Sequence, residues 1–126
     1  MGADLAYIGS AFIATEEANA EAAYKQAIVD YNSSDIVYSN LFTGVHGNYL
    51  APSIRSAGLD PDNLPESDPS QMDFGSGGNQ DAKAWKNIWG CGQGIGAVKS
   101  VGSAESLIAR LSSEYAKARA RVLDAA

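Results

Sequence analysis

The sequence is poor in cysteine, in clustered basic residues and in long apolar runs, and each shortage excludes a class of protein. Its single cysteine, Cys91, cannot form a disulfide within the chain, and the ligand spacing of a four-coordinate zinc site is absent. The 126 residues carry 9 basic and 15 acidic side chains, a formal net charge of -6. This balance disfavours nucleic-acid and anionic-membrane surfaces, because these require clustered Lys and Arg.

We also expect neither a membrane span nor an export signal in this sequence. No apolar run approaches the roughly 18 residues needed to span a bilayer. The opening residues, Met1 to Asp4, carry an acid and no basic region, unlike a secretory signal. Apolar residues make up 45% and charged residues 19%, as in ordinary globular proteins. We therefore expect one globular unit with one core in a reducing cytoplasm.

The first elements expected along the chain are a strand and a helix. The apolar run Leu5 to Ile8 predicts a strand buried on both faces of a parallel sheet. Thr15 is expected to cap a helix that ends near Tyr31, with Glu16 and Glu17 in the first turn, where the helix dipole favours acidic side chains. The apolar stripe of this helix would comprise Ala20, Tyr24, Ala27, Ile28 and Tyr31.

Short elements and one long loop are expected in the middle of the chain. Residues 36–38 predict a second extended segment. Asn48 is expected to cap a short helix that ends near Ala57, and Gly58 fits the left-handed position after that helix. Residues 59–80 hold three of the four prolines and a Gly-Ser-Gly-Gly tract, which indicates a long loop.

The clearest helix is predicted at the end of the sequence, over residues 103–124. Ser103 is expected to cap it, and basic residues near its carboxyl end complement the helix dipole. Upstream, residues 81–89 predict a short helix with Trp85 and Trp89 on one face. The apolar face of the terminal helix is formed by Leu107, Ile108, Leu111, Tyr115, Ala118 and Val122.

The predicted strand Leu5 to Ile8 lacks neighbours within the sequence. A buried parallel strand needs strands on both sides and layers on both faces. The remaining sequence offers one weak strand, residues 36–38, and no strand–helix–strand repeat. The strand's neighbours are therefore expected in a part of the protein missing from this sequence. The alternative is a small α+β domain with an edge strand.

Several motifs resemble one enzyme family. Residues 2–17, Gly-Ala-Asp-Leu-Ala-Tyr-Ile-Gly-Ser-Ala-Phe-Ile-Ala-Thr-Glu-Glu, resemble the last strand and following turn of nitronate monooxygenases. That family shows Gly-Ala-Asp, an apolar strand, Gly-Thr or Gly-Ser, and then Phe-x-Ala-Thr-x-Glu. Further matches are residues 24–28, residues 42–44, the Gly-Gln-Gly-Ile-Gly stretch of residues 92–96 and the terminal amphipathic helix. The matches follow in order over essentially the whole chain.

The resemblance implies the carboxyl-terminal fragment of a (β/α)₈ TIM barrel that binds FMN at the carboxyl ends of its strands. Complete barrels of this type have about 250 residues or more. The chain would then supply the last βα unit in residues 1–33 and a carboxyl-terminal extension in residues 34–126, with the missing amino-terminal barrel portion as its partner.

The turn after the predicted strand is the candidate phosphate site. A strand that ends in Gly9-Ser10 and leads into a helical turn offers free backbone amides to an anion, and the Ser10 hydroxyl adds another hydrogen bond. The simpler interpretation is an ordinary turn capped by serine. The resemblance implies FMN phosphate at this turn, Tyr7 and Ile8 against the cofactor, and Gln93 as a further flavin contact.

We expect the other polar, reactive and aromatic residues to have mainly structural roles. Gly92 to Gly96 lacks the spacing and the setting of a dinucleotide-binding motif. Cys91 is expected to pack and not to act as a nucleophile, because no partner that would lower its pKa is evident. Trp85 and Trp89 are expected to anchor the extension. His46 lies in a polar loop, where we expect it to be solvated or to cap the backbone. The alternative is that it lines the mouth of a substrate site.

The resemblance implies an FMN-dependent oxidoreductase, with oxidation of alkyl nitronates by O₂ as the family's named reaction. The family's catalytic histidine lies in the missing part and is not His46, so we expect no catalytic residue and no metal ligand in this chain. The expected partner is a small-molecule substrate, with no nucleic acid and no membrane. The alternatives are NAD(P)H-dependent quinone or enoyl reduction, and a non-catalytic remnant or interaction module.

Overall fold

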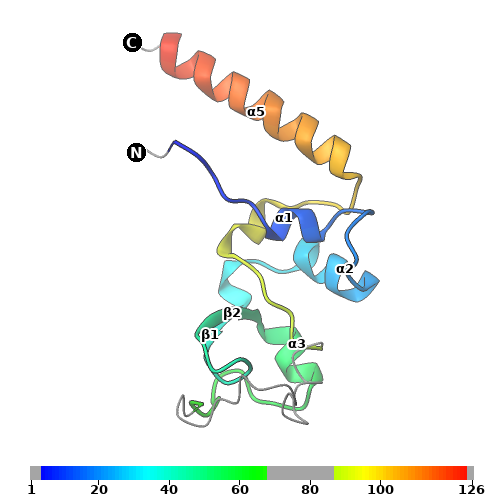
Figure 1. Cartoon of the computed structure of the whole chain (residues 1–126), viewed down its shortest axis with the longest axis vertical. Helices are drawn as coiled ribbons and strands as arrows, with labels where there is room; N and C mark the ends of the chain where they lie inside the picture. The colour runs from blue at the N-terminus through cyan, green and yellow to red at the C-terminus, as the bar shows by residue number, and fades with distance from the viewer. Residues whose placement is uncertain (1–3, 68–86, 125–126) are drawn as a thin grey trace, which may run out of the picture.

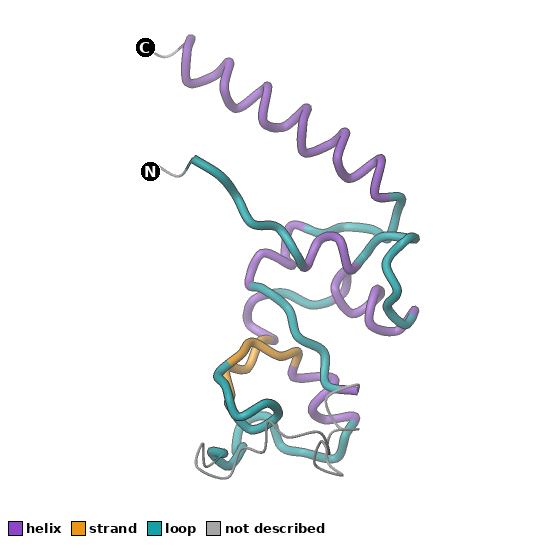
Figure 2. Tube along the Cα trace, in the orientation of Figure 1, coloured by secondary structure: helices purple, strands orange, loops and turns teal. Residues whose placement is uncertain are grey.

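The computed structural model describes residues 4–67 and 87–124. These residues contain four α-helices, two 3₁₀ helices and a two-stranded antiparallel sheet. In Figure 1, α5 and the amino-terminal segment project away from the remaining elements, and Figure 2 shows loops joining most of them. The elements in chain order are α1 (Ser10–Ile13), α2 (Ala22–Asp30), η1 (Ser33–Asp35), β1 (Ile36–Ser39), β2 (Gly47–Leu50), α3 (Ala51–Ser56), η4 (Gln93–Ala97) and α5 (Ala104–Asp124).

The strand predicted at Leu5 to Ile8 is not formed among the described residues. Figure 1 shows this segment as an extended trace that leads into α1, and no described strand pairs with it. Leu5 and Tyr7 are 92% and 104% exposed. An apolar run exposed on both faces has none of the burial that stabilises a parallel strand. The described residues thus provide neither neighbouring strands nor covering layers for this segment.

The helix predicted from Thr15 to Tyr31 begins later than expected, at Ala22. Thr15 instead forms an isolated parallel β-bridge with Gly102. Two backbone hydrogen bonds hold this bridge, from Glu16 N to Gly102 O at 2.9 Å and from Gly102 N to Ala14 O at 3.3 Å. The Thr15 hydroxyl donates to Phe12 O at 2.8 Å and does not accept from a backbone amide of a following helix, so the expected cap is wrong.

Glu17 serves the start of α5 and not the start of a helix of its own. Its two carboxylate oxygens accept hydrogen bonds from Ala104 N at 3.1 and 2.9 Å. The carboxylate lies where the helix dipole favours negative charge, but on a helix distant in sequence. Ser103 Oγ accepts from Ser106 N at 3.1 Å, which confirms Ser103 as the predicted cap of α5.

The second predicted extended segment is confirmed as β1, which pairs with β2. The register places Ile36 opposite Leu50 and Tyr38 opposite Asn48. Asn48 therefore belongs to a strand, and the prediction that it caps a helix is wrong. Its neighbours explain the difference, since Asn48 O accepts from Cys91 N at 3.1 Å and Leu50 N donates to Trp89 O at 2.8 Å. The segment around Trp89 thus extends the hydrogen bonding of β2.

The helix after β2 ends as the sequence predicts. Helix α3 carries Pro52 in its first turn, where the missing amide costs no helical hydrogen bond. Gly58 follows the helix with φ +82°, in the left-handed region that favours glycine. Residues 59–67 form turns and irregular structure, in line with the predicted loop. Trp85, the rest of that loop and most of the expected helix at residues 81–89 lie outside the described residues.

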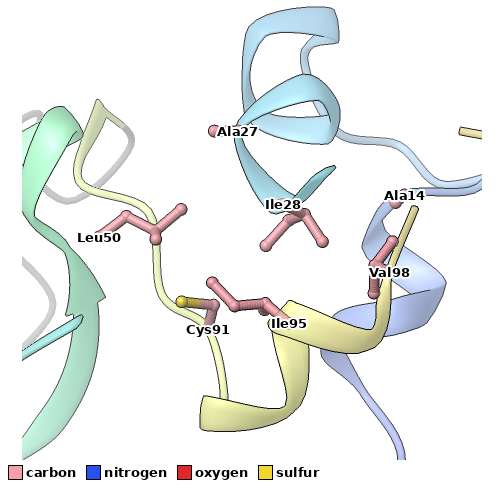
Figure 3. Packing of buried hydrophobic residues seen from close by; sticks show 7 residues of the cluster. All are labelled: Ala14, Ala27, Ile28, Leu50, Cys91, Ile95 and Val98. Atoms are coloured by element: carbon pink, nitrogen blue, oxygen red, sulfur yellow. The ribbon is translucent and has the colours of Figure 1, made fainter. Parts of the chain in front are cut away.

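The main core is a single cluster that joins α1, α2, β2 and η4. Figure 3 shows Ile28 of α2 above Ile95 of η4, with Leu50 and Cys91 on one side and Val98 on the other. Side chains from residues 1–33 and from residues 34–126 meet in this cluster. A smaller cluster contains Tyr49, Ile54 and Ile88. Helix α5 contributes no buried residue to either cluster.

Candidate functional site

The Gly9-Ser10 turn contacts the glycine-rich segment that precedes η4. Ser10 Oγ accepts a hydrogen bond from Gly92 N at 2.6 Å, across 82 residues of sequence. A Cβ atom at Gly92 would lie 3.4 Å from Ser10 Oγ, in ordinary van der Waals contact with the hydroxyl. The contact joins two of the stretches, residues 2–17 and residues 92–96, that the sequence analysis singled out.

The geometry of the turn leaves backbone donors available. Gly9 is the N-cap of α1, and its carbonyl accepts from Phe12 N at 2.9 Å. Among residues 4–67 and 87–124, no hydrogen bond from the amides of Ser10 or Ala11 is present. A Cβ atom at Gly9 would meet nothing within 4 Å, so the space beside the turn is open. Free amides in an open turn are the donors that a phosphate group requires.

The other predicted cofactor contacts are less enclosed. Tyr7 lies fully exposed in the extended segment, and Ile8 is 41% exposed. Gln93 begins η4, directly after Gly92, and its side chain is exposed. The structure therefore brings Gly9, Ser10 and the start of η4 together. It leaves the Tyr7 side chain outside this group.

An aromatic pair holds the segment before Gly92 in place. The rings of Tyr24 and Trp89 stack with centroids 5.3 Å apart and planes 9° apart. The Tyr24 hydroxyl donates to the Gly90 carbonyl, and Trp89 N donates to the buried Ser53 hydroxyl at 3.0 Å. Trp89 thus packs against the main core, as predicted for an anchor. Gly92 and Tyr24 were not predicted to support the turn; only their places in the resembling stretches point to them.

Cys91 is a buried thiol whose pKa is raised. Its side chain belongs to the main core, and burial raises its pKa from 9.0 to about 11. Burial also raises the pKa of Tyr24 from 10.0 to about 12, with a smaller contribution from Cys91. Both groups are neutral near pH 7, which suits packing and hydrogen bonding but not attack on a substrate.

These raised pKa values predict a loss of stability at alkaline pH. In the unfolded chain Cys91 loses its proton near pH 9.0, whereas the folded chain keeps it to about 11. The folded state then binds more protons than the unfolded state, so stability falls as pH rises through this window. Thermal unfolding followed by circular dichroism from neutral to alkaline pH should show the fall. A Cys91→Ala variant should lose less stability over the same pH range. An equally steep loss of stability in this variant would contradict the raised pKa of Cys91.

His46 lies away from the Ser10–Gly92 contact. Its ring stacks on Tyr38 at the end of the β1–β2 hairpin where the loop connects the two strands, with centroids 4.8 Å apart and planes 22° apart. Both side chains are exposed. No predicted site residue is in contact with His46 among the interactions of the described residues, so the substrate-mouth role receives no structural support.

A shallow groove lies beside the candidate turn, between the end of α1 and the start of α5. Its volume is about 260 Å³, and its lining includes Thr15, Lys99, Ser103 and Arg110. Gly9, Ser10 and Gln93 do not line it. Among the described residues no group of three or more His, Cys, Asp or Glu side chains is placed to hold a metal ion. None of the described helices is long and apolar enough to cross a bilayer.

No protein-family model, curated protein or solved structure matches this chain.

Proposed function

We propose that the chain supplies the phosphate-binding turn of an FMN-dependent oxidoreductase of the nitronate monooxygenase type. The observation that carries this proposal is the hydrogen bond from Gly92 N to Ser10 Oγ. It connects two motifs that are far apart in sequence and that both resemble the same flavoenzyme family.

The residues at the turn fit a phosphate group. The unbonded amides of Ser10 and Ala11 and the open space at Gly9 provide donors and room for an oxyanion. The Ser10 hydroxyl accepts from Gly92, so its own hydrogen is free to donate to a phosphate oxygen. Gly92 thereby orients the hydroxyl, and the Tyr24–Trp89 stack fixes the segment that carries Gly92.

These contacts suggest separate roles for FMN and for the residues around it. FMN, when bound, would supply the electron transfer to and from a small organic substrate. Gly9 and Ser10 would hold its phosphate, and Ile8 and Tyr7 would lie next to it along the chain. Gln93, exposed at the start of η4, would be a further contact of the same cofactor. The catalytic base would come from the remaining barrel units, which the chain does not contain.

The proposed substrate is an alkyl nitronate, oxidised with O₂ as the second substrate. The proposed compartment is the cytoplasm, where the single buried thiol stays reduced. NAD(P)H-dependent reduction of quinones or enoyl compounds would use the same phosphate turn. Assays of NAD(P)H oxidation and of nitronate-dependent O₂ consumption distinguish these reactions.

The test is the cofactor content of the natural gene product. The purified protein should show the flavin absorption bands, and FMN should be released on denaturation and identified by mass spectrometry. Addition of an alkyl nitronate should then start O₂ consumption. A protein that folds cooperatively, contains no flavin and does not bind added FMN would contradict the proposal and favour an interaction module.

A further inference from the structure

A second hollow lies between the start of α2, the end of α3 and the segment that carries Trp89. We call it the α2–α3 hollow. Its volume is about 210 Å³, and the residues that line it are Glu21, Ser53, Ser56, Ala57, Asn87 and Trp89. None of the proposed flavin contacts, residues 7–10 and Gln93, is among them. The α2–α3 hollow is therefore separate from the proposed phosphate turn.

The aromatic wall of this hollow is held in place by contacts on its far side. Ser53 is 1% exposed, and its hydroxyl donates to Leu50 O at 2.7 Å while it accepts from Trp89 N at 3.0 Å. The ring of Tyr24 stacks on the indole of Trp89 with centroids 5.3 Å apart. Backbone and ring of Trp89 are thus both fixed within the protein. A ligand in the hollow would meet a preorganised indole, which lowers the entropy cost of binding.

The charge in the hollow is negative. Glu21 is exposed at the N-cap of α2, and its side chain makes no capping hydrogen bond. Lys25 lies one turn further along α2 but directs its ammonium to Glu16 O at 3.0 Å. Among residues 4–67 and 87–124, no Lys, Arg or His lines the hollow and no ion pair includes Glu21. The carboxylate of Glu21 therefore sets the charge of this site.

The end of α3 adds hydrogen-bond acceptors to the same hollow. Ser56 Oγ donates to Pro52 O at 2.9 Å, so its oxygen remains able to accept a hydrogen bond from a ligand. Ser56 and Ala57 lie at the carboxyl end of the helix, where the backbone carbonyls carry partial negative charge. A carboxylate, an indole ring and these acceptors all attract a positively charged group.

We propose that the α2–α3 hollow binds a small organic ammonium ion, with Glu21 as its counter-ion and the Trp89 ring as its apolar, electron-rich wall. An indole ring attracts cations through its π system, and a nearby carboxylate adds a full negative charge. A divalent metal ion is a poorer occupant, because it takes several oxygen ligands and usually more than one carboxylate. An anion would be repelled by Glu21. This site is independent of the proposed flavin chemistry.

The test is a titration of the natural gene product with tetramethylammonium chloride, followed through the indole N–H signal of Trp89 in nuclear magnetic resonance spectra. The signal should shift and saturate with a dissociation constant that is roughly millimolar for so small a ligand. Sodium chloride at the same ionic strength should leave it in place. The neutral probe tert-butanol has a similar size and shape without the charge, and it should cause no saturable shift. Equal responses to the two probes, or none to tetramethylammonium, would overturn the proposal.

A pair of charge-removing variants locates the bound cation. Glu21→Gln should weaken tetramethylammonium binding by roughly fivefold to tenfold, as the loss of one nearby charge in a solvated site predicts. The variant should keep its fold, because the Glu21 side chain makes no capping hydrogen bond. Glu16→Gln removes the same charge from an exposed residue outside the hollow and should change the affinity less than about twofold, because salt screens distant charges. Equal affinities of the two variants would place the cation elsewhere and contradict the site.

Discussion

Replacing Ile95 with alanine is expected to lower the free energy of unfolding by about 2–5 kcal/mol. Ile95 is fully buried in η4 and packs against Ile28, Cys91 and Val98 in the main core. The substitution leaves a cavity among side chains from four elements, which cannot all move to fill it. Domains of this size are stable by about 5–15 kcal/mol, so the loss is a large part of the total. Urea unfolding followed by tryptophan fluorescence measures it.

The matched control is the same substitution at an exposed isoleucine. Ile108 is 56% exposed on α5, and Ile108→Ala removes the same atoms while creating no cavity. Its effect on the chain by itself should stay within about 0.5 kcal/mol, as for other surface substitutions. Equal losses from Ile95→Ala and Ile108→Ala would mean that α5 is packed in solution or that the main core is not formed.

Elements defined by local patterns could be predicted from the sequence. Helix α5 has a serine cap and a regular apolar stripe, and the structure places its start within a residue of the expected position. The strand at β1 and the left-handed glycine after α3 were also predicted. Each of these depends on residues close together in sequence, where propensity and capping act directly.

Elements decided by distant contacts could not be predicted in this way. Thr15 pairs with Gly102 and does not cap a helix, and the strand β2 pairs with β1 while Asn48 and Leu50 also bond to the segment around Trp89. Asn48 is a good helix cap by local rules, but the backbone partners favour a strand. Nothing near Thr15 or Asn48 in the sequence signals these partners.

In the candidate site, too, some residues could be predicted from the local sequence and others only from the fold. Gly9-Ser10 could be selected from local chemistry, because a glycine and a hydroxyl follow an apolar run and precede a helical turn. The role of Gly92 requires the fold, which brings its amide to Ser10 Oγ from 82 residues away. Gln93 was selected through the resemblance alone, and it lies exposed directly after Gly92.

Ser10→Asp is expected to weaken FMN binding by the natural gene product by roughly fivefold to a thousandfold. A carboxylate about 4 Å from a phosphate charge is repelled by about 1 kcal/mol in water and about 4 kcal/mol at a protein surface, and about 1.4 kcal/mol is a tenfold change in affinity.

Ser10→Asn is the matched control, because asparagine has the size of aspartate without the charge. Both side chains can accept the Gly92 amide through an oxygen, so the fold of the turn should persist in both. Quenching of flavin fluorescence gives the two dissociation constants, and added salt should narrow their difference. Equal affinities for the aspartate and asparagine variants would place the phosphate away from this turn.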